Sequence, residues 1–442
     1  MEVRKGYKQT EAGIIPEDWG VWSFKEISSM KGRIGWQGLK QIEFTMNPDE
    51  PYLITGMNFK DGEIRWDEVY HVPMERYEIA KEIQLKIDDV LMTKDGTIGK
   101  LLFINKIPYP GKATLNSHLL VFRPIRNSYV PKFLYYQLTS KTFKDYIELS
   151  KSGTTFFGIS QEAVGKYKAF FPPTKAEQTV IATALSDTDA LIGSLEKFIE
   201  KKRNIKQGTI QELLSGRKRL PGFEKKAGYK LTDVGIIPVD WDVKNLKDIS
   251  FMKGRIGWQG LKETEFTMNL EEPFLITGMN FKDGQIRWNE VYHVSFERYE
   301  VAKNIQLKIG DLLITKDGTI GKLLFVDTIP YPNIATLNSH LLVLRPLQNN
   351  YVPKFLYYQL ASETFKDYIE LSKSGSTFFG ISQEAMGNYK TILPTVVEQT
   401  AIATVLSDMD AEIEALEQKL LKYRMIKQGM MQELLTGKTR LI

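Results

Sequence analysis

A lysine preceded by two spaced glycines is the first feature of the sequence whose residue types suggest chemistry. Gly96-Thr-Ile-Gly-Lys100 resembles the loops that cradle nucleotide phosphates, but such a loop needs four residues between its glycines and a Ser or Thr after the lysine. Here two residues separate the glycines, and Leu101 follows the lysine. The segment instead predicts a hairpin that turns at Asp95-Gly96. Lys94 and Lys100 would then be free to face phosphates.

The sequence contains neither the carboxylate pattern of a nuclease nor the loop of an adenine methyltransferase. Pro48-Asp49 is not followed at a useful distance by an acid-x-Lys pair; Glu63-x-Arg65 comes nearest. A methyltransferase loop would read Asn/Asp-Pro-Pro-Tyr/Phe, whereas Phe171-Pro-Pro-Thr174 lacks its polar first and aromatic last residue. The prolines favour a strand end followed by a helix start. We expect no catalytic residues.

Metal and cofactor sites are not indicated either. The four histidines, His71, His118, His293 and His340, have no short His-x-His spacing and no cysteine beside them. The chain has no cysteine at all, which excludes disulfides and thiolate zinc sites and favours a reducing compartment. His118 directly precedes Leu-Leu-Val, so a structural role at a strand end and a contact to DNA both remain open.

Length and charge set broad limits. The 442 residues are 42% hydrophobic and 26% charged, so several buried cores are possible and disorder is excluded. A net charge of +5 permits a nucleic-acid partner, but any basic surface must be local. Residues 1–10 carry charges with no apolar run behind them, and no stretch is long enough to cross a bilayer. We therefore expect a soluble, cytoplasmic protein without a membrane partner.

Residues 31–40, Lys-Gly-Arg-Ile-Gly-Trp-Gln-Gly-Leu-Lys, combine glycine flexibility with the side chains that read nucleic acids. Arginine reads guanine edges, glutamine reads adenine, and lysine neutralises phosphate. The alternative is a loop whose Trp36 caps the core and whose charges are merely solvated. Residues 151–155, with Ser160-Gln161, form a second polar loop that carries glycine.

The chain consists of two tandem copies of one sequence, and this internal repeat determines its domain organisation. Residues 31–40 return letter for letter as residues 253–262, 222 positions later, and the offset becomes 221 after one residue is lost near Pro394. Each predicted contact therefore has a copy. The candidates for base contact are Arg33, Gln37, Arg255 and Gln259. The candidates for phosphate contact or stacking are Lys31, Trp36, Lys40, Lys94, Lys100, Lys151, Ser152, Lys253, Trp258, Lys262, Lys316, Lys322, Lys373 and Ser374.

Each copy begins with a mixed α/β part. Residues 83–92, 100–104 and 118–122 are predicted to be strands from their apolar and β-branched content. Residues 131–149 are predicted to form one amphipathic helix, with Pro131 in its first turn and Gly153 beyond its end.

Each copy ends in a long helix with a coiled-coil seam. In the second copy, nine of ten positions with 4-3 spacing are apolar, and in the first copy six of ten. Two separate amphipathic surface helices are the alternative. The apolar seam residues predicted to pair the helices are Ile181, Leu185, Ile192, Leu195, Ile199, Leu213, Ile402, Leu406, Met409, Ile413, Leu416, Leu420, Met430 and Leu434.

The predicted fold is α+β. Two α/β domains, residues 1–173 and 217–394, are separated by two helices, residues 174–216 and 395–442. The helices are expected to pair as an antiparallel coiled coil, which gives the chain an internal pseudo-two-fold. A helix of some 40 residues is about 60 Å long.

The junctions between domain and helix resemble a known family. Phe156-Phe-Gly-Ile-Ser160, Leu185-Ser-Asp187 and Gln211-Glu-Leu-Leu-Ser-Gly216 look like the conserved region of type I restriction specificity subunits, and the second copy repeats them. Asp89-Val-Leu-Met-Thr-Lys-Asp-Gly-Thr-Ile-Gly-Lys100 is similar to the target-recognition motif of that family. The resemblance covers nearly the whole chain.

This resemblance implies that each α/β domain reads one half of a split site in double-stranded DNA. It implies that the helices set the spacing and dock two modification subunits, which bind S-adenosylmethionine and methylate adenine. Restriction and motor subunits would join through them, and the chain itself would need no cofactor. Family members usually carry two dissimilar recognition domains, whereas here the domains are nearly the same. We therefore expect an interrupted palindrome, with half-site centres about 34 Å apart or a little more.

Overall fold

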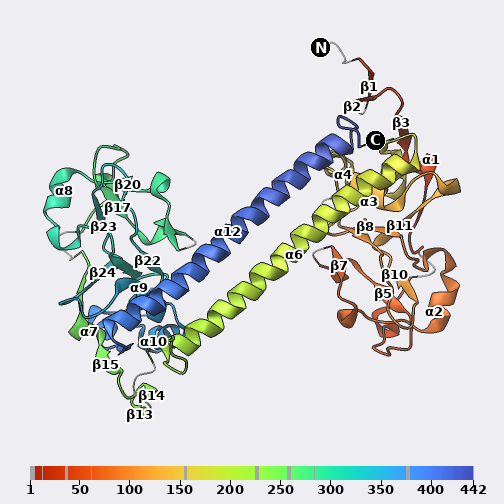
Figure 1. Ribbon diagram of the computed structural model, residues 1–442. Coiled ribbons are helices and arrows are strands. Elements are labelled where there is room, and N and C mark those ends of the chain that lie inside the picture. The colour runs from red at the N-terminus through yellow and green to blue at the C-terminus, as the bar shows by residue number, and fades with distance from the viewer. Residues whose placement is uncertain are drawn as a thin grey trace. The chain divides into compact units, whose positions relative to one another are not determined.

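The computed structural model describes residues 5–11, 13–34, 38–60, 62–153, 157–223, 228–255, 260–282, 284–374 and 379–441. The chain divides into two compact units (Figure 1). Unit 1 comprises Met1–Glu196 with Gln418–Ile442, and unit 2 comprises Lys197–Glu417. Each unit thus holds one α/β domain, the first half of the helix that follows it and the second half of the other long helix.

A four-stranded antiparallel sheet forms the centre of the α/β domain in unit 1. Its order is β4 (Ser28–Lys31), β11 (Leu119–Pro124), β8 (Val90–Thr93) and β9 (Leu101–Phe103). All four residues of β8 are buried, as an apolar strand between two partners requires. The predicted strand over residues 83–92 is wrong in its first part, because the chain turns at Asp88, with φ of 68°, before β8 begins.

A second, two-stranded sheet lies beside the first. Its strands β5 (Tyr52–Ile54) and β10 (Ala113–Leu115) run parallel, so they end at the same edge. Every residue of both strands is buried, and they share an apolar cluster with the inner side chains of β8 and β11. The domain therefore has two cores, one on each side of the main sheet.

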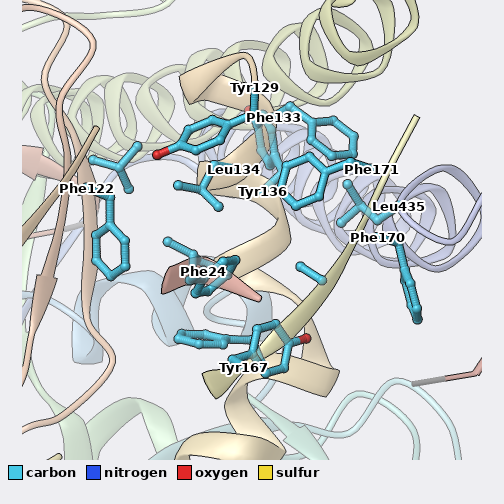
Figure 2. Close-up of a cluster of buried hydrophobic side chains, with 14 of the residues drawn as sticks. Phe24, Phe122, Tyr129, Phe133, Leu134, Tyr136, Tyr167, Phe170, Phe171 and Leu435 are labelled. Atoms are coloured by element: carbon cyan, nitrogen blue, oxygen red, sulfur yellow. The ribbon is translucent and has the colours of Figure 1, made fainter. Parts of the chain in front are cut away.

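The other core lies under the helices (Figure 2). The single helix predicted over residues 131–149 is in fact two, α3 (Pro131–Thr139) and α4 (Lys141–Ser150). Ser140 separates them: its extended backbone ends α3, and its Oγ accepts from the Phe143 amide as the N-cap of α4. Phe133 of α3 and Phe143 of α4 are buried, and Leu435, just past the end of the C-terminal helix, completes this core.

The remaining elements of unit 1 are short: β1 (Tyr7–Thr10), β2 (Gly13–Pro16), β3 (Gly20–Ser23), α1 (Phe24–Ile27), β6 (Phe59–Lys60), β7 (Glu63–Ile64), α2 (Met74–Ile79), α5 (Gln161–Lys166) and β12 (Lys168–Phe171).

Unit 2 repeats this architecture. Its main sheet has the order β16 (Ser250–Lys253), β24 (Leu341–Pro346), β21 (Leu312–Thr315) and β22 (Leu323–Phe325), and β17 (Phe274–Ile276) pairs in parallel with β23 (Ala335–Leu337). The other elements are β13 (Tyr229–Thr232), β14 (Gly235–Pro238), β15 (Asp242–Asn245), α7 (Leu246–Ile249), β18 (Phe281–Lys282), β19 (Gln285–Ile286), β20 (Tyr292–His293), α8 (Phe296–Glu300), α9 (Pro353–Leu360), α10 (Glu363–Ser372), α11 (Gln383–Gly387) and β25 (Lys390–Leu393).

The long helices are α6 (Lys175–Leu214) and α12 (Val396–Leu434). They run antiparallel, because partner numbers fall on one helix as they rise on the other. In unit 1, Asp189 pairs with Lys427 at 2.5 Å and Glu196 with Arg424 at 2.6 Å. In unit 2, Lys202 pairs with Glu412 at 2.6 Å and Arg203 with Glu417 at 2.5 Å.

The helix seam follows the predicted spacing. Every position with 4-3 spacing on α6, from Ile181 to Leu213, and on α12, from Ile402 to Leu434, is buried or half-buried. The lysines of the seam reach acids on the facing helix: Lys206 binds Asp410, and Lys427 binds Asp189. The antiparallel coiled coil predicted from the sequence is confirmed.

An arginine just beyond the end of each long helix binds a glutamate in the first turn of the other long helix and an aspartate of the α/β domain. Arg219 binds Glu398 through Nε at 2.5 Å and Nη2 at 2.7 Å, and it binds Asp240 at 3.0 and 3.1 Å. Trp241 donates to the same Glu398 carboxylate at 3.2 Å. In unit 1, Arg440 binds Glu177 and Asp18 in the same way. Each first-turn glutamate is thereby buried without being left unpaired.

Among the described residues, no helix has the length and apolar character required to cross a membrane.

Candidate nucleic-acid interface

Strand register brings four loops of unit 1 to one edge of the two sheets. Thr93, the last residue of β8, pairs with Leu119, the first of β11. The loop after β8, residues 94–99, and the loop before β11, residues 116–118, therefore lie at the same edge of the sheet. Residues 55–58 follow β5, and the Asn116 amide donates to the Ile54 carbonyl at 2.9 Å. The segment after β4 leaves beside the start of β11, because a Cβ on Gly32 would lie 2.9 Å from the Leu119 carbonyl oxygen.

His118 lies where these loops meet. Its amide donates to Asn116 Oδ1 at 3.1 Å, and its carbonyl accepts from the Lys94 amide at 2.9 Å. Its Nδ1 lies 3.2 Å from Asp95 Oδ2, while 60% of its side chain is exposed. Pairing with Asp95 orients the ring and leaves Nε2 as the group that can meet a ligand.

The polar loop after α4 joins the same edge. Gly158 bridges both Asp95 and Ser152, and a Cβ at Gly158 would lie 2.8 Å from Asp95 Oδ1. A larger residue here would displace the Asp95 carboxylate from its present position. Lys151 Nζ lies 5.0 Å from the centre of the Phe157 ring and 2.5 Å from Glu148. The described parts of three segments singled out in the sequence thus lie at this edge: residues 31–34, residues 94–100, and residues 151–153 with 157–160.

Unit 2 builds the same edge with nearly identical exposure. His340 Nδ1 lies 3.3 Å from Asp317 Oδ2, and their side chains are 61% and 40% exposed, against 60% and 41% for His118 and Asp95. Lys373 lies 5.0 Å from the Phe379 ring, as Lys151 does from Phe157. The histidine–aspartate pair and the lysine beside the phenylalanine ring are thus exposed to nearly the same extent in both copies.

The structure corrects the prediction that Arg33 and Arg255 contact bases. Arg33 is only 5% exposed; its Nε donates to the Leu115 carbonyl at 2.7 Å and its Nη2 to Thr114 Oγ1 at 3.0 Å. Arg255 repeats these bonds at 2.8 and 3.1 Å and is 4% exposed. Burial, with a contribution from the nearby Arg76, lowers the pKa of Arg33 to about 10. Both arginines are buried and anchor the start of a loop to the strand beside it instead of facing outward.

Arg76 is an anchor that sequence reasoning missed. Its Nη2 donates to the Gly38 carbonyl at 2.6 Å, and its Nε lies 2.8 Å from Glu43 Oε1. Arg298 makes the same contacts with Gly260 and Glu265. Arg33 and Arg76 therefore hold both sides of the loop after β4, although they come from different parts of the chain. No spacing within residues 31–40 could have signalled this.

The other predicted contacts fall into three groups. Lys40, Lys100, Ser152, Lys253, Lys262, Lys322 and Ser374 are exposed, and Lys94, Lys151, Lys316 and Lys373 are half-exposed. Lys31 is half-exposed and pairs with Glu82 at 2.9 Å. Trp36, Gln37, Trp258 and Gln259 lie outside the described residues.

The two other histidines, His71 and His293, are buried and bonded to the backbone. His71 is 6% exposed, and its Nδ1 lies 2.6 Å from the Glu50 carbonyl, with its ring against Tyr52. His293 repeats this arrangement with Glu272 and Phe274. Within the described part of the chain, no group of three or more His, Asp or Glu side chains is placed to hold a metal ion.

Comparison with known proteins agrees with this duplicated architecture. The family model of the type I restriction modification DNA specificity domain matches twice, over residues 16–207 and 238–423. The chain belongs to this family. Each match covers most of one α/β domain and much of the long helix that follows it, so the chain carries two specificity domains.

Relatives match this specificity protein along its whole length. It is 27% identical over 99% of the chain to the putative type I restriction enzyme MjaX specificity subunit of Methanocaldococcus jannaschii, covering 97% of that protein. It is 26% identical to the MjaVIII specificity subunit of the same organism, over 99% of this chain and 96% of that protein. The S subunit of a type I restriction-modification system from M. genitalium has the same fold, with a TM-score of 0.59, 15% identity and 98% of both chains covered.

Proposed function

We propose that this chain is the DNA-specificity subunit of a type I restriction-modification complex and carries no catalytic group of its own. The observation that carries the proposal is the loop edge, present twice, on a chain that belongs to the type I specificity family. Glycine-spaced loops with exposed lysines, a serine and a histidine suit contacts to phosphates and base edges.

In this proposal residues 1–173 and 217–394 are the recognition domains. Lys40, Lys94, Lys100, Lys151 and Ser152, with their copies Lys262, Lys316, Lys322, Lys373 and Ser374, contact phosphates. Gln37 and Gln259 keep their predicted role at bases, and Trp36 and Trp258 their predicted role in stacking. Arg33 and Arg255 are positioning residues, and Lys31 is held by Glu82 in unit 1.

We further propose that the target is an interrupted palindrome. The two recognition domains expose the His118–Asp95 and His340–Asp317 pairs almost equally, and identical groups select identical bases. Antiparallel helices favour a reversed second half-site, as in two-fold dimers on operators. Differences such as Gln41 against Glu263 would bias one half only weakly.

The helices, residues 174–216 and 395–442, are proposed to set the half-site spacing and to dock two modification subunits. Restriction subunits would join through the modification subunits. The partner is double-stranded DNA rather than a membrane, and the site of action is the cytoplasm. A solved structure of similar fold belongs to the complex assembly and conformational transition of the type I R-M system; it has a TM-score of 0.52 and 16% identity and covers 96% of this chain and 99% of that one.

A salt titration of DNA binding tests the proposal. Fluorescence anisotropy of a labelled duplex would be followed from about 50 to 200 mM salt, with the chain alone and with its modification subunits. We expect log affinity to fall linearly with log salt, because bound lysines release counterions. An affinity that does not change with salt concentration would contradict the proposal. Cleavage of DNA with Mg²⁺, or methylation of DNA with S-adenosylmethionine, by the purified chain alone would contradict it too.

A further inference from the structure

At the loop edge of each unit, a methionine side chain projects into solvent. Met57 is 80% exposed and Met279 83% exposed, in the turns that follow β5 and β17. Neither side chain belongs to a core. We propose that Met57 and Met279 are specificity-determining residues, each of which contacts the 5-methyl group of a thymine in its half-site. This inference rests on the proposed function and extends it to a named base.

The turn that presents Met57 is fixed by hydrogen bonds. Asn58 Oδ1 accepts from the Thr55 amide at 2.8 Å and from Thr55 Oγ1 at 2.9 Å. Thr55 Oγ1 lies 3.3 Å from the Met57 amide, which donates to it. Thr277 and Asn280 make the same bonds at 2.8 Å around Met279. The backbone under each methionine is therefore held before any ligand arrives, while the side chain itself is free to adapt.

The turn lies beside the groups proposed to meet DNA. A Cβ on Gly56 would lie 3.0 Å from Thr93 Cγ2, and Thr93 directly precedes Lys94. The Asn116 amide, two residues before His118, donates to the Ile54 carbonyl at the other side of the turn. In unit 2, a Cβ on Gly278 would lie 3.2 Å from Thr315 Cγ2. Met57 and Met279 are thus exposed apolar side chains close to the cationic and polar groups of the edge, which also holds the Phe157 and Phe379 rings facing Lys151 and Lys373.

A methionine at such a place can contribute only an apolar contact. Its thioether accepts hydrogen bonds weakly, so it offers nothing to a phosphate. Among the groups that base pairs display in the major groove, the thymine 5-methyl is the apolar one, and contact with it distinguishes thymine from cytosine. The unbranched, flexible side chain of methionine can adjust its conformation to reach this methyl group.

The test removes single methyl groups from the DNA. Once methylation sequencing has given the target, each thymine of both half-sites is replaced in turn by deoxyuridine, which differs only in lacking the 5-methyl. Binding is measured for the complex with its modification subunits, using the wild-type chain, Met57→Ala and Met279→Ala. Leu231→Ala is the control, because Leu231 is 82% exposed but lies in β13, away from the loop edge.

We expect one deoxyuridine position in each half-site to weaken wild-type binding about fourfold, the value for one methyl-sized apolar group. Met57→Ala should abolish this effect in one half-site only, Met279→Ala in the other, and Leu231→Ala in neither. The intact half-site in each single variant reports that the protein is folded.

Sequence-specific binding that no deoxyuridine weakens, or that deoxyuridine weakens equally in the methionine variants, would overturn the thymine contact and leave the proposed function standing. A target without thymine in its half-sites would overturn it too. Absence of any sequence preference in the wild-type complex would instead refute the proposed function, and the thymine contact with it.

Discussion

Replacing Arg219 with alanine tests how much the buried ion pair between Arg219 and Glu398 stabilises unit 2. Glu398 is 1% exposed and the Arg219 side chain 9%, so both charges of this pair are out of water. Arg219→Ala would leave Glu398 with only the bond from Trp241 and without a compensating charge. Breaking a buried pair in this way costs about 3–5 kcal/mol, a factor of about 100 or more in the local opening equilibrium.

Hydrogen exchange measured by mass spectrometry would show this loss as faster exchange around the start of α12 and around β14. Arg203→Ala is the matched control: Arg203 and Glu417 also pair between the helices, but their side chains are 62% and 41% exposed. That pair is worth about 0–1 kcal/mol. Arg440→Ala should cost less than Arg219→Ala, because Arg440 is 30% exposed. Equal protection in Arg219→Ala and Arg203→Ala would refute the reasoning.

Four further predictions concern the helix seam and the recognition edge. Leu416→Lys with Leu420→Lys places charges in the seam at a cost of several kcal/mol, and we expect assembly with the modification subunits to be lost on a sizing column; unchanged assembly would contradict this. Lys40→Ala should weaken binding to all sequences alike and reduce the slope of log affinity against log salt concentration by about 1. A loss of affinity confined to the cognate duplex would contradict a phosphate contact by Lys40. His118→Ala should weaken binding to cognate DNA without lowering thermal stability, since the side chain is exposed; a destabilised protein would assign it a structural role. Arg33→Ala should reduce discrimination and also hydrogen-exchange protection of residues 113–115, by about 1–3 kcal/mol, whereas an arginine that only reads bases would leave protection unchanged.

The features predicted from the sequence are those encoded by local or periodic patterns. The 222-residue repeat determined that there are two like domains, and the 4-3 spacing located the helix seam from Ile181 to Leu213 and from Ile402 to Leu434. The hairpin after Thr93 followed from Asp95-Gly96, since glycine accepts the left-handed φ of 69° found at Gly96.

The errors arose where distant residues decide the environment. A glycine-flanked arginine in a polar loop has the composition of a ligand contact, but Arg33 is buried because Thr114 and Leu115, some eighty residues away, accept its hydrogen bonds. The break at Ser140 was missed because the apolar pattern continues across it, while the N-cap bond to Phe143 outweighs helix continuity. The ion pair of Arg219 involves Glu398, 179 residues later, and no local pattern reveals it.

Methylation sequencing of DNA modified by this chain together with its modification subunits tests the central claim most directly. The account predicts methylated adenines within an interrupted palindrome, a short half-site followed by a spacer of unread bases and the reverse complement of that half-site. Two unrelated half-sites would contradict the argument from the duplicated recognition edges. Methylation without any sequence preference would contradict the assignment of this chain as the subunit that reads DNA.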